Sequence, residues 1–168
     1  MTTSAATPLH GEIAALLPRL RRFARSIAYN RDDADDLVQV AVERALNRSA
    51  QWEVGTRLDS WMFRIMKNAW VDEVRSRIRR DNIFAPEEAG EHVGDGFAEA
   101  HQQRLAIQKA ISLLSEDHRM VVGLVLVDGM AYQEAADVLD LPLGTLMSRL
   151  ARARSALQAS LSDQTRTV

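Results

Sequence analysis

The last third of the chain carries guanidinium and hydroxyl groups close together in sequence. Arg149, Arg152 and Arg154 follow Thr145 and Ser148 within about three helical turns. Guanidinium groups bind phosphates and guanine edges, and hydroxyls donate to phosphate oxygens. This combination suits a nucleic acid, although an amphipathic helix with solvated arginines would show the same pattern. The residues alone leave both interpretations open.

The sequence around these residues predicts a helix-turn-helix that would present them. A short helix is expected over 132–139 and a longer one over 143–161, with a turn at Asp140-Leu141-Pro142 between them. Leu146 and Leu150 lie four residues apart and would bury one face of the longer helix. The arginines would then lie on its other faces.

A second group of polar side chains opens a predicted helix near the middle of the first half. Asp33, Asp36 and Gln39 offer hydrogen-bond acceptors, and Leu37 could pack in a contact. Asp33 is the expected N-cap. An acidic first turn stabilised by the helix dipole would explain the same residues. A metal site is disfavoured, because no histidine or glutamate is placed nearby to complete it.

A long helix is predicted over 58–80, with Trp61, Met62 and Ile65 on its apolar face. Aromatic, amide and basic side chains on this helix suit unpaired bases and phosphates. Core packing is the alternative for Phe63, and the favoured role for Trp61.

Both halves resemble the extracytoplasmic-function (ECF) RNA polymerase sigma factors of the sigma-70 family. In the second half, the residues that resemble region 4 of that family are Tyr132, Ala135, Ala136, Pro142, Gly144, Thr145, Ser148, Arg149, Arg152, Ala153 and Arg154. In the first half, the run from Asp33 to Gln39 and the run from Ser60 to Asp72 resemble region 2. Two residues depart from the pattern: Met147 stands where Lys or Arg is frequent, and Ala151 where a bulky residue is frequent. The Pro-x-Leu-Arg-x-Phe-Ala run at 18–24 is also similar to the alphaproteobacterial general-stress subgroup.

The resemblance implies an all-α protein of two small helical domains. Region 2, a helical bundle, would cover 9–80, and the region 4 helix-turn-helix would cover 101–162. A flexible acidic linker would join them over 81–100, which holds six Asp or Glu and no Arg or Lys. Residues 19–80, in contrast, hold fourteen Arg or Lys against nine Asp or Glu.

The resemblance also implies partners and contact residues. The β′ clamp helices of core RNA polymerase would bind Asp33, Asp36, Leu37 and Gln39, and the β flap is a further expected contact. Promoter DNA would be bound at its −10 element by Phe63, Arg64, Lys67, Asn68, Arg75 and Arg79. The −35 element would be bound by Thr145, Ser148, Arg149, Arg152 and Arg154, with Arg149 and Arg154 on phosphates or in intramolecular pairs. An anti-sigma factor is the expected regulator.

Other features of the sequence bear on enzymatic and membrane functions. The chain has 168 residues, no cysteine and four scattered histidines, and it lacks a Gly-rich phosphate loop, so we expect neither an enzyme nor a metal or cofactor. The first fifteen residues do not form a secretion signal, and the longest apolar run, 120–127, is too short to span a membrane. The sequence therefore predicts a cytoplasmic protein without membrane insertion.

Three functions remain possible from the sequence. The first is a promoter-specific, stress-responsive initiation factor controlled by an anti-sigma factor. The second is a sigma-like decoy that sequesters an anti-sigma factor without binding promoters, which Met147 and Ala151 would suit. The third is a helix-turn-helix repressor or activator, which would have no use for a polymerase-docking helix.

Overall fold

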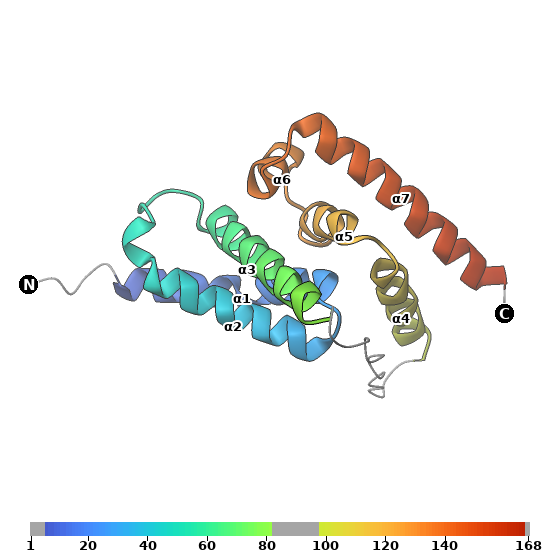
Figure 1. Cartoon of the computed structure of the whole chain (residues 1–168), viewed down its shortest axis with the longest axis horizontal. Coiled ribbons are helices and arrows are strands. Elements are labelled where there is room, and N and C mark those ends of the chain that lie inside the picture. The colour runs from blue at the N-terminus through green and yellow to red at the C-terminus, as the bar shows by residue number, and fades with distance from the viewer. Residues whose placement is uncertain (1–5, 82–97, 167–168) are drawn as a thin grey trace, which may run out of the picture.

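The computed structural model describes residues 6–81 and 98–166, which form helices joined by short turns (Figure 1). The all-α prediction is confirmed over these residues. The predicted linker falls mainly on 82–97, which lie outside the described residues. The first half holds α1 (Ala6–Ile27), α2 (Arg31–Asn47), the 3-10 turn η1 (Ser49–Gln51) and α3 (Leu58–Asp81). The second half holds α4 (Ala98–Ser112), α5 (Glu116–Val122), the π-helical turn η2 (Gly123–Val127), α6 (Tyr132–Leu139) and α7 (Leu143–Arg166).

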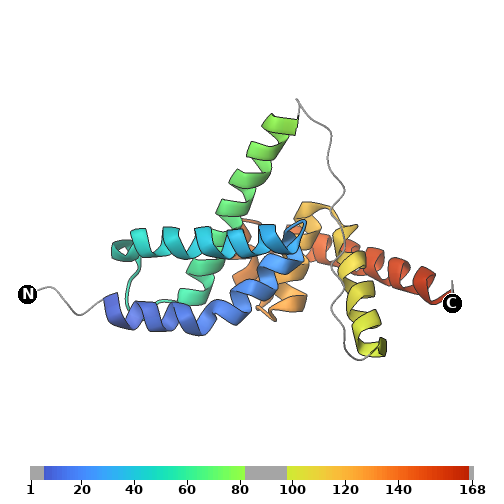
Figure 2. The same ribbon diagram turned by 90° about the horizontal axis from the view of Figure 1, so that it is seen from below.

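The first three helices pack into a bundle, in which α3 crosses α1 and α2 steeply (Figure 2). Ala34, Ala41 and Ala45 are fully buried on α2, and their small side chains let the neighbouring helices approach closely. Phe23 of α1 and Phe63 of α3 meet edge to face, with ring centroids 5.2 Å apart. An apolar interior thus fixes the orientation of α2 and α3.

The helix α1 continues through Pro18 instead of ending before it. A proline inside a helix removes one backbone hydrogen bond and crowds the preceding turn, so a kink or a break is expected there. Figure 2 shows α1 changing direction partway along its length. The proline therefore bends this helix without breaking it.

The caps of two helices test the predicted helix starts. Asn30 has extended backbone angles, and its side-chain oxygen accepts a hydrogen bond of 2.8 Å from the Asp33 amide. The prediction that Asp33 is the N-cap was wrong, since Asn30 takes that position three residues earlier. The sequence also predicts a helix from Glu116 with Ser115 as its cap, and this prediction is confirmed: Ser115 is the N-cap of α5 and accepts a hydrogen bond from the His118 amide.

The second half contains the predicted helix-turn-helix, formed by α6 and α7. Ala135 and Ala136 of α6 are completely buried, and Leu146 and Leu150 lie on the buried face of α7. Asp140 ends α6 in the left-handed conformation, with φ of 54°, which a short polar side chain tolerates better than most. The turn holds α7 at a fixed angle to α6.

Apolar residues of the two halves pack together in one cluster, while a smaller cluster around Leu114, Val122 and Ala153 lies within the second half. Val121 and Leu124 of the second half are fully buried in the same cluster as Phe23 and Met66 of the first half. Gly123 lies so close to α1 that a Cβ there would be 2.5 Å from Ser26 Oγ. The sequence predicted two helical modules but not this closed arrangement, which rests on contacts between distant segments.

Candidate functional site

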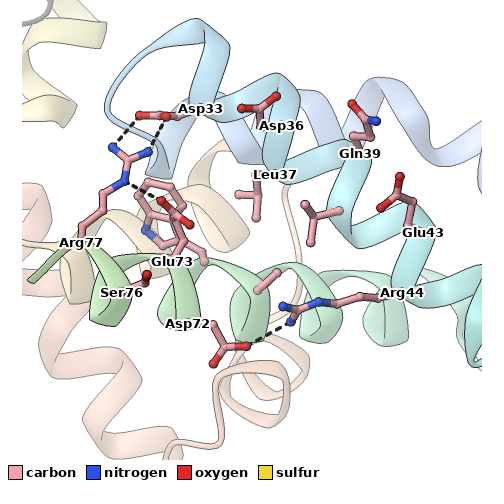
Figure 3. A pocket seen from close by; sticks show the side chains of 13 residues that line it. Asp33, Asp36, Leu37, Gln39, Glu43, Arg44, Asp72, Glu73, Ser76 and Arg77 are labelled. Atoms are coloured by element: carbon pink, nitrogen blue, oxygen red, sulfur yellow. Dashed lines mark hydrogen bonds and ion pairs between the residues drawn. The ribbon is translucent and has the colours of Figure 1, made fainter. Parts of the chain in front are cut away.

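A groove of about 560 Å³ runs between α2 and α3 (Figure 3). Asp36 and Gln39 are exposed on its α2 side, whereas Leu37 is only 5 % exposed and belongs to the core. The groove thus offers oxygen acceptors above an apolar floor. All four predicted polymerase contacts, Asp33, Asp36, Leu37 and Gln39, line it.

One end of the groove is closed by an ion pair between its two helices. The guanidinium of Arg77 donates to both carboxylate oxygens of Asp33, at 2.5 and 3.0 Å, and its Nε donates to Glu73 at 2.8 Å (Figure 3). The hydrogen bond to Asp33 is the main reason that the pKa of Arg77 is raised. Asp33 is therefore held inside the protein, and Asp36 and Gln39 remain the more accessible acceptors.

The predicted −10 contacts on α3 divide into two groups. Asn68, Arg75 and Arg79 are exposed. In contrast, Arg64 donates to the Asp137 carbonyl at 2.6 Å and to Asp140 at 3.3 Å. Lys67 Nζ donates to Asp140 at 3.1 Å. The second half of the chain thus occupies two cations that are predicted to hold DNA phosphates.

Phe63 does not fit its predicted role. Its side chain is fully buried, its ring meets Phe23 edge to face, and the Arg19 guanidinium lies 5.6 Å from its centroid. A ring enclosed in this way cannot stack on a base, so the core-packing alternative describes it correctly. The burial follows from its position on the same side of α3 as Met66 and Trp70.

The outer face of α7 presents the predicted −35 contacts. Ser148 and Arg152 are exposed, and Thr145 is half-buried. Arg149 pairs with Asp117 of α5 at 3.3 Å, and Arg154 donates to the Tyr132 hydroxyl at 3.3 Å. The two arginines that are expected to bind phosphates or other side chains of the chain thus have intramolecular partners here.

A further set of charged residues joins the two halves, and sequence reasoning missed it. Arg19 of α1 donates to both oxygens of Asp128, at 3.0 and 2.8 Å, and also contacts Asp59. Arg57 bridges Asp59 and Glu134. The Asp128 hydrogen bond is the largest cause of the raised pKa of Arg19, and Arg57 is the largest cause of the lowered pKa of Asp59. In the sequence, Asp128 and Gly129 predict only the end of a helix. No local feature indicates that Asp128 has a partner more than a hundred residues away.

Two expected absences can be examined over residues 6–81 and 98–166. Within these ranges no helix has the length and apolar character needed to cross a membrane. No group of three or more histidine or carboxylate side chains there is arranged to hold a metal ion.

Comparison with known proteins identifies both halves. Residues 13–67 match the family model described as the Sigma2 domain of PhyR, and residues 104–157 match that of sigma-70 region 4. The groove and the helix-turn-helix therefore belong to a sigma-type protein. The ECF RNA polymerase sigma factor EcfG of Rhodopseudomonas palustris is 35 % identical over 157 residues, which cover 91 % of this chain and 84 % of EcfG. The chain belongs to the ECF RNA polymerase sigma factor family.

Two solved structures share the fold. The sigma factor RpoE from Bartonella quintana, solved with the anti-sigma factor NepR, has a TM-score of 0.77 and 32 % identity, with 91 % of this chain and 96 % of RpoE covered. CnrH, solved with the cytosolic domain of CnrY, has a TM-score of 0.70 and 26 % identity, with 95 % and 93 % covered. The likeness in both cases spans the two halves together.

Proposed function

We propose that this chain directs core RNA polymerase to specific promoters. One observation carries the proposal. This member of the ECF family has both a groove lined by oxygen acceptors and a helix-turn-helix with an exposed outer face. Asp36 and Gln39 would bind the polymerase clamp, while Asp33 would shape the groove through Arg77. The chain would supply positioning only, and bond formation would belong to the polymerase.

The DNA contacts are assigned by exposure. Ser148 and Arg152 of α7 would contact the −35 element, because both are exposed on the outer face of the recognition helix. Asn68 would read a base of the −10 element, and Arg75 and Arg79 would hold its phosphates. Met147 is 49 % exposed beside Ser148, so it offers thymine methyl groups an apolar contact in place of a phosphate-binding cation.

We also propose that an anti-sigma factor controls the chain in the cytoplasm. The supporting observation is that two structures similar to this chain over both halves were solved with an anti-sigma factor or with the cytosolic domain of CnrY. A stress response is a further part of this proposal, supported by the resemblance of the 18–24 run to the general-stress subgroup.

Transcription from a promoter panel by purified core polymerase tests the proposal. The wild-type chain is expected to give promoter-dependent transcripts. Arg152→Ala is expected to weaken promoter binding and to lower the slope of log affinity against log salt by about 0.9, the value for one lost phosphate contact. Arg149→Ala is the matched control, since Asp117 already holds that guanidinium, and a smaller change in slope is expected.

The same assay tests the decoy alternative. Met147 and Ala151 lie exposed on α7, where a decoy would tolerate the loss of cationic or bulky side chains. A decoy binds an anti-sigma factor but gives no transcript from any promoter of the panel. That result would overturn the promoter-directing function and leave the fold assignment intact.

A further inference from the structure

One exposed side of α7 carries apolar side chains next to the proposed −35 contacts. Leu143, Met147 and Ala151 follow one another at four-residue spacing, so they lie along the same side of the helix. All three are exposed, Leu143 by 38 % and Met147 by 49 %. Scattered exposed apolar residues are ordinary on a protein surface, whereas adjoining ones are typical of a contact surface. We call these three residues the apolar row.

The apolar row adjoins the polar residues that are proposed to contact the −35 element. Ser148 follows Met147 by one position and Arg152 follows Ala151 by one position, and both are exposed. In contrast, Arg149 and Arg154 of the same helix have intramolecular partners, Asp117 and the Tyr132 hydroxyl. The accessible surface of the recognition helix is therefore half polar and half apolar.

Base edges in the major groove of DNA match both halves of this surface. The hydroxyl and the guanidinium can bind base edges and phosphates, and the C5 methyl of thymine is the apolar group that the groove presents. Eight residues of helix span about 12 Å, and base pairs follow one another every ~3.4 Å. The apolar row thus extends over about three to four base pairs.

The two central side chains of this region suit contact with methyl groups in different ways. Met147 is unbranched and flexible, so its thioether can follow a methyl group whose position varies with the local shape of the DNA. Ala151 is short, so the helix can approach the bases closely at that point. A lysine or arginine at position 147 would reach a phosphate instead and would carry no such preference for a base.

We propose that the apolar row reads the C5 methyl groups of thymines in the −35 element, with Met147 as the principal specificity-determining residue. This inference rests on the proposed promoter-directing function and deepens it, because it names the chemical group that the recognition helix distinguishes. Promoters that lack a thymine at the contacted base pairs bind less tightly.

Deoxyuridine tests the methyl groups one at a time, because it lacks only the C5 methyl and keeps the hydrogen-bonding groups of thymine. The full-length wild-type chain first selects a −35 duplex from random sequences, and each thymine of that duplex is then replaced. At least one replacement is expected to lower the affinity about fourfold, the factor for one buried methyl group. Replacements outside the selected element are expected to leave the affinity unchanged.

Variants of the protein connect this effect to Met147. Met147→Ala is expected to bind the thymine and deoxyuridine duplexes equally tightly. Leu113→Ala is the matched control, because it shortens an apolar side chain that is 71 % exposed just after α4, and it is expected to keep the fourfold difference. Met147→Arg is expected to lose the difference and to steepen the slope of log affinity against log salt by about 0.9, the value for one added phosphate contact.

Three results would overturn the proposal: a selected duplex without any thymine, no effect of deoxyuridine on the wild-type chain, or an equal effect on wild type and Met147→Ala. The duplex measurements need no polymerase, because Met147, Ser148 and Arg152 are exposed in the free chain. Methyl recognition can therefore fail while promoter-dependent transcription succeeds, and it can succeed in a chain that gives no transcript.

Discussion

At the scale of single residues, Arg77 connects several parts of the first half. Its guanidinium binds Asp33 through both oxygens, binds Glu73, and lies 5.4 Å from the centre of the Tyr29 ring. It thereby ties the start of α2 to the last turns of α3. The neighbouring Arg79 is exposed, although both arginines lie in the same basic run of the sequence.

Replacing Arg77 tests this difference. Arg77→Ala is expected to lower the free energy of unfolding by about 1–3 kcal/mol, because a charge-assisted bidentate contact and a cation–π contact are lost. Urea unfolding measures the change. Arg79→Ala serves as the control and is expected to stay within about 0.5 kcal/mol of wild type; equal losses in the two variants would contradict the assigned role.

Tyr29 gives the protein a predictable response to alkaline pH. Burial, followed by the hydrogen bond to Glu116, raises the pKa of Tyr29 to about 12, whereas an unfolded tyrosine titrates near pH ~10. The neutral phenol therefore stabilises the fold fully below about pH 10, and this contribution is lost as pH rises toward about 12. Wild type is expected to lose stability more steeply than Tyr29→Phe over that range.

Two measurements check the Tyr29 prediction. Urea midpoints at a series of alkaline pH values compare the two proteins, and phenolate absorbance follows the titration itself. The difference spectrum between wild type and Tyr29→Phe isolates this residue from Tyr132, the other tyrosine. Parallel stability curves from about pH 10 to about 12 would contradict a raised pKa of Tyr29 in the folded protein.

At the scale of elements, η2 determines how closely the second half approaches α1. Gly123 begins this turn, and a Cβ at that position would lie 2.5 Å from Ser26 Oγ and 2.8 Å from a ring carbon of Phe23. π-Helical turns are uncommon and are often found at functional positions. Here the turn brings a backbone without a side chain against α1 and leads directly to Asp128.

Two glycine substitutions distinguish the effect of close packing on stability from the effect of helix propensity. Gly123→Ala is expected to lower the free energy of unfolding by about 1–3 kcal/mol through overpacking. Gly11→Ala is expected to raise it by about 0.5–1 kcal/mol, because Gly11 lies within α1 and nothing lies within 4 Å of the position that a Cβ would take. Thermal unfolding compares both with wild type, and a neutral Gly123→Ala would show that the crossing is looser than its geometry indicates.

At the scale of the whole molecule, the shared core and the Arg19–Asp128 pair couple the two halves. The side chain of Asp128 is 1 % exposed, whereas that of Asp72, which pairs with Arg44, is 59 % exposed. The three tryptophans all lie in the first half, at Trp52, Trp61 and Trp70. Tryptophan fluorescence therefore reports on that half and on its contacts, while far-ultraviolet circular dichroism reports on all helices.

These two probes can measure the coupling. Their denaturation curves are expected to coincide for wild type and to separate for Asp128→Ala, which leaves Arg19 with Asp59 alone and weakens the contact between halves by about 1–3 kcal/mol. Asp72→Ala is the control, with coincident curves and a loss below about 1 kcal/mol. Coincident curves for Asp128→Ala would mean that the Arg19–Asp128 pair is not needed to couple the halves.

Local signals in the sequence were sufficient for the helices and the helix-turn-helix. Apolar spacing predicted α6, α7 and most of α3, Ser115 was recognised as a cap, and the spacing of Ser148 and Arg152 placed both on an outer face. These features depend on residues a few positions apart, so the order of residues along the chain determines them.

The tertiary structure alone decided which of those residues are accessible to another molecule. It buries Phe63, pairs Asp33 with Arg77, and places Asp128 and Asp140 in contact with cations of the first half. The ion pairs among these contacts join residues 44 to 109 positions apart. No local period or cap encodes them, because burial and ion pairing between distant segments are fixed only when the helices pack.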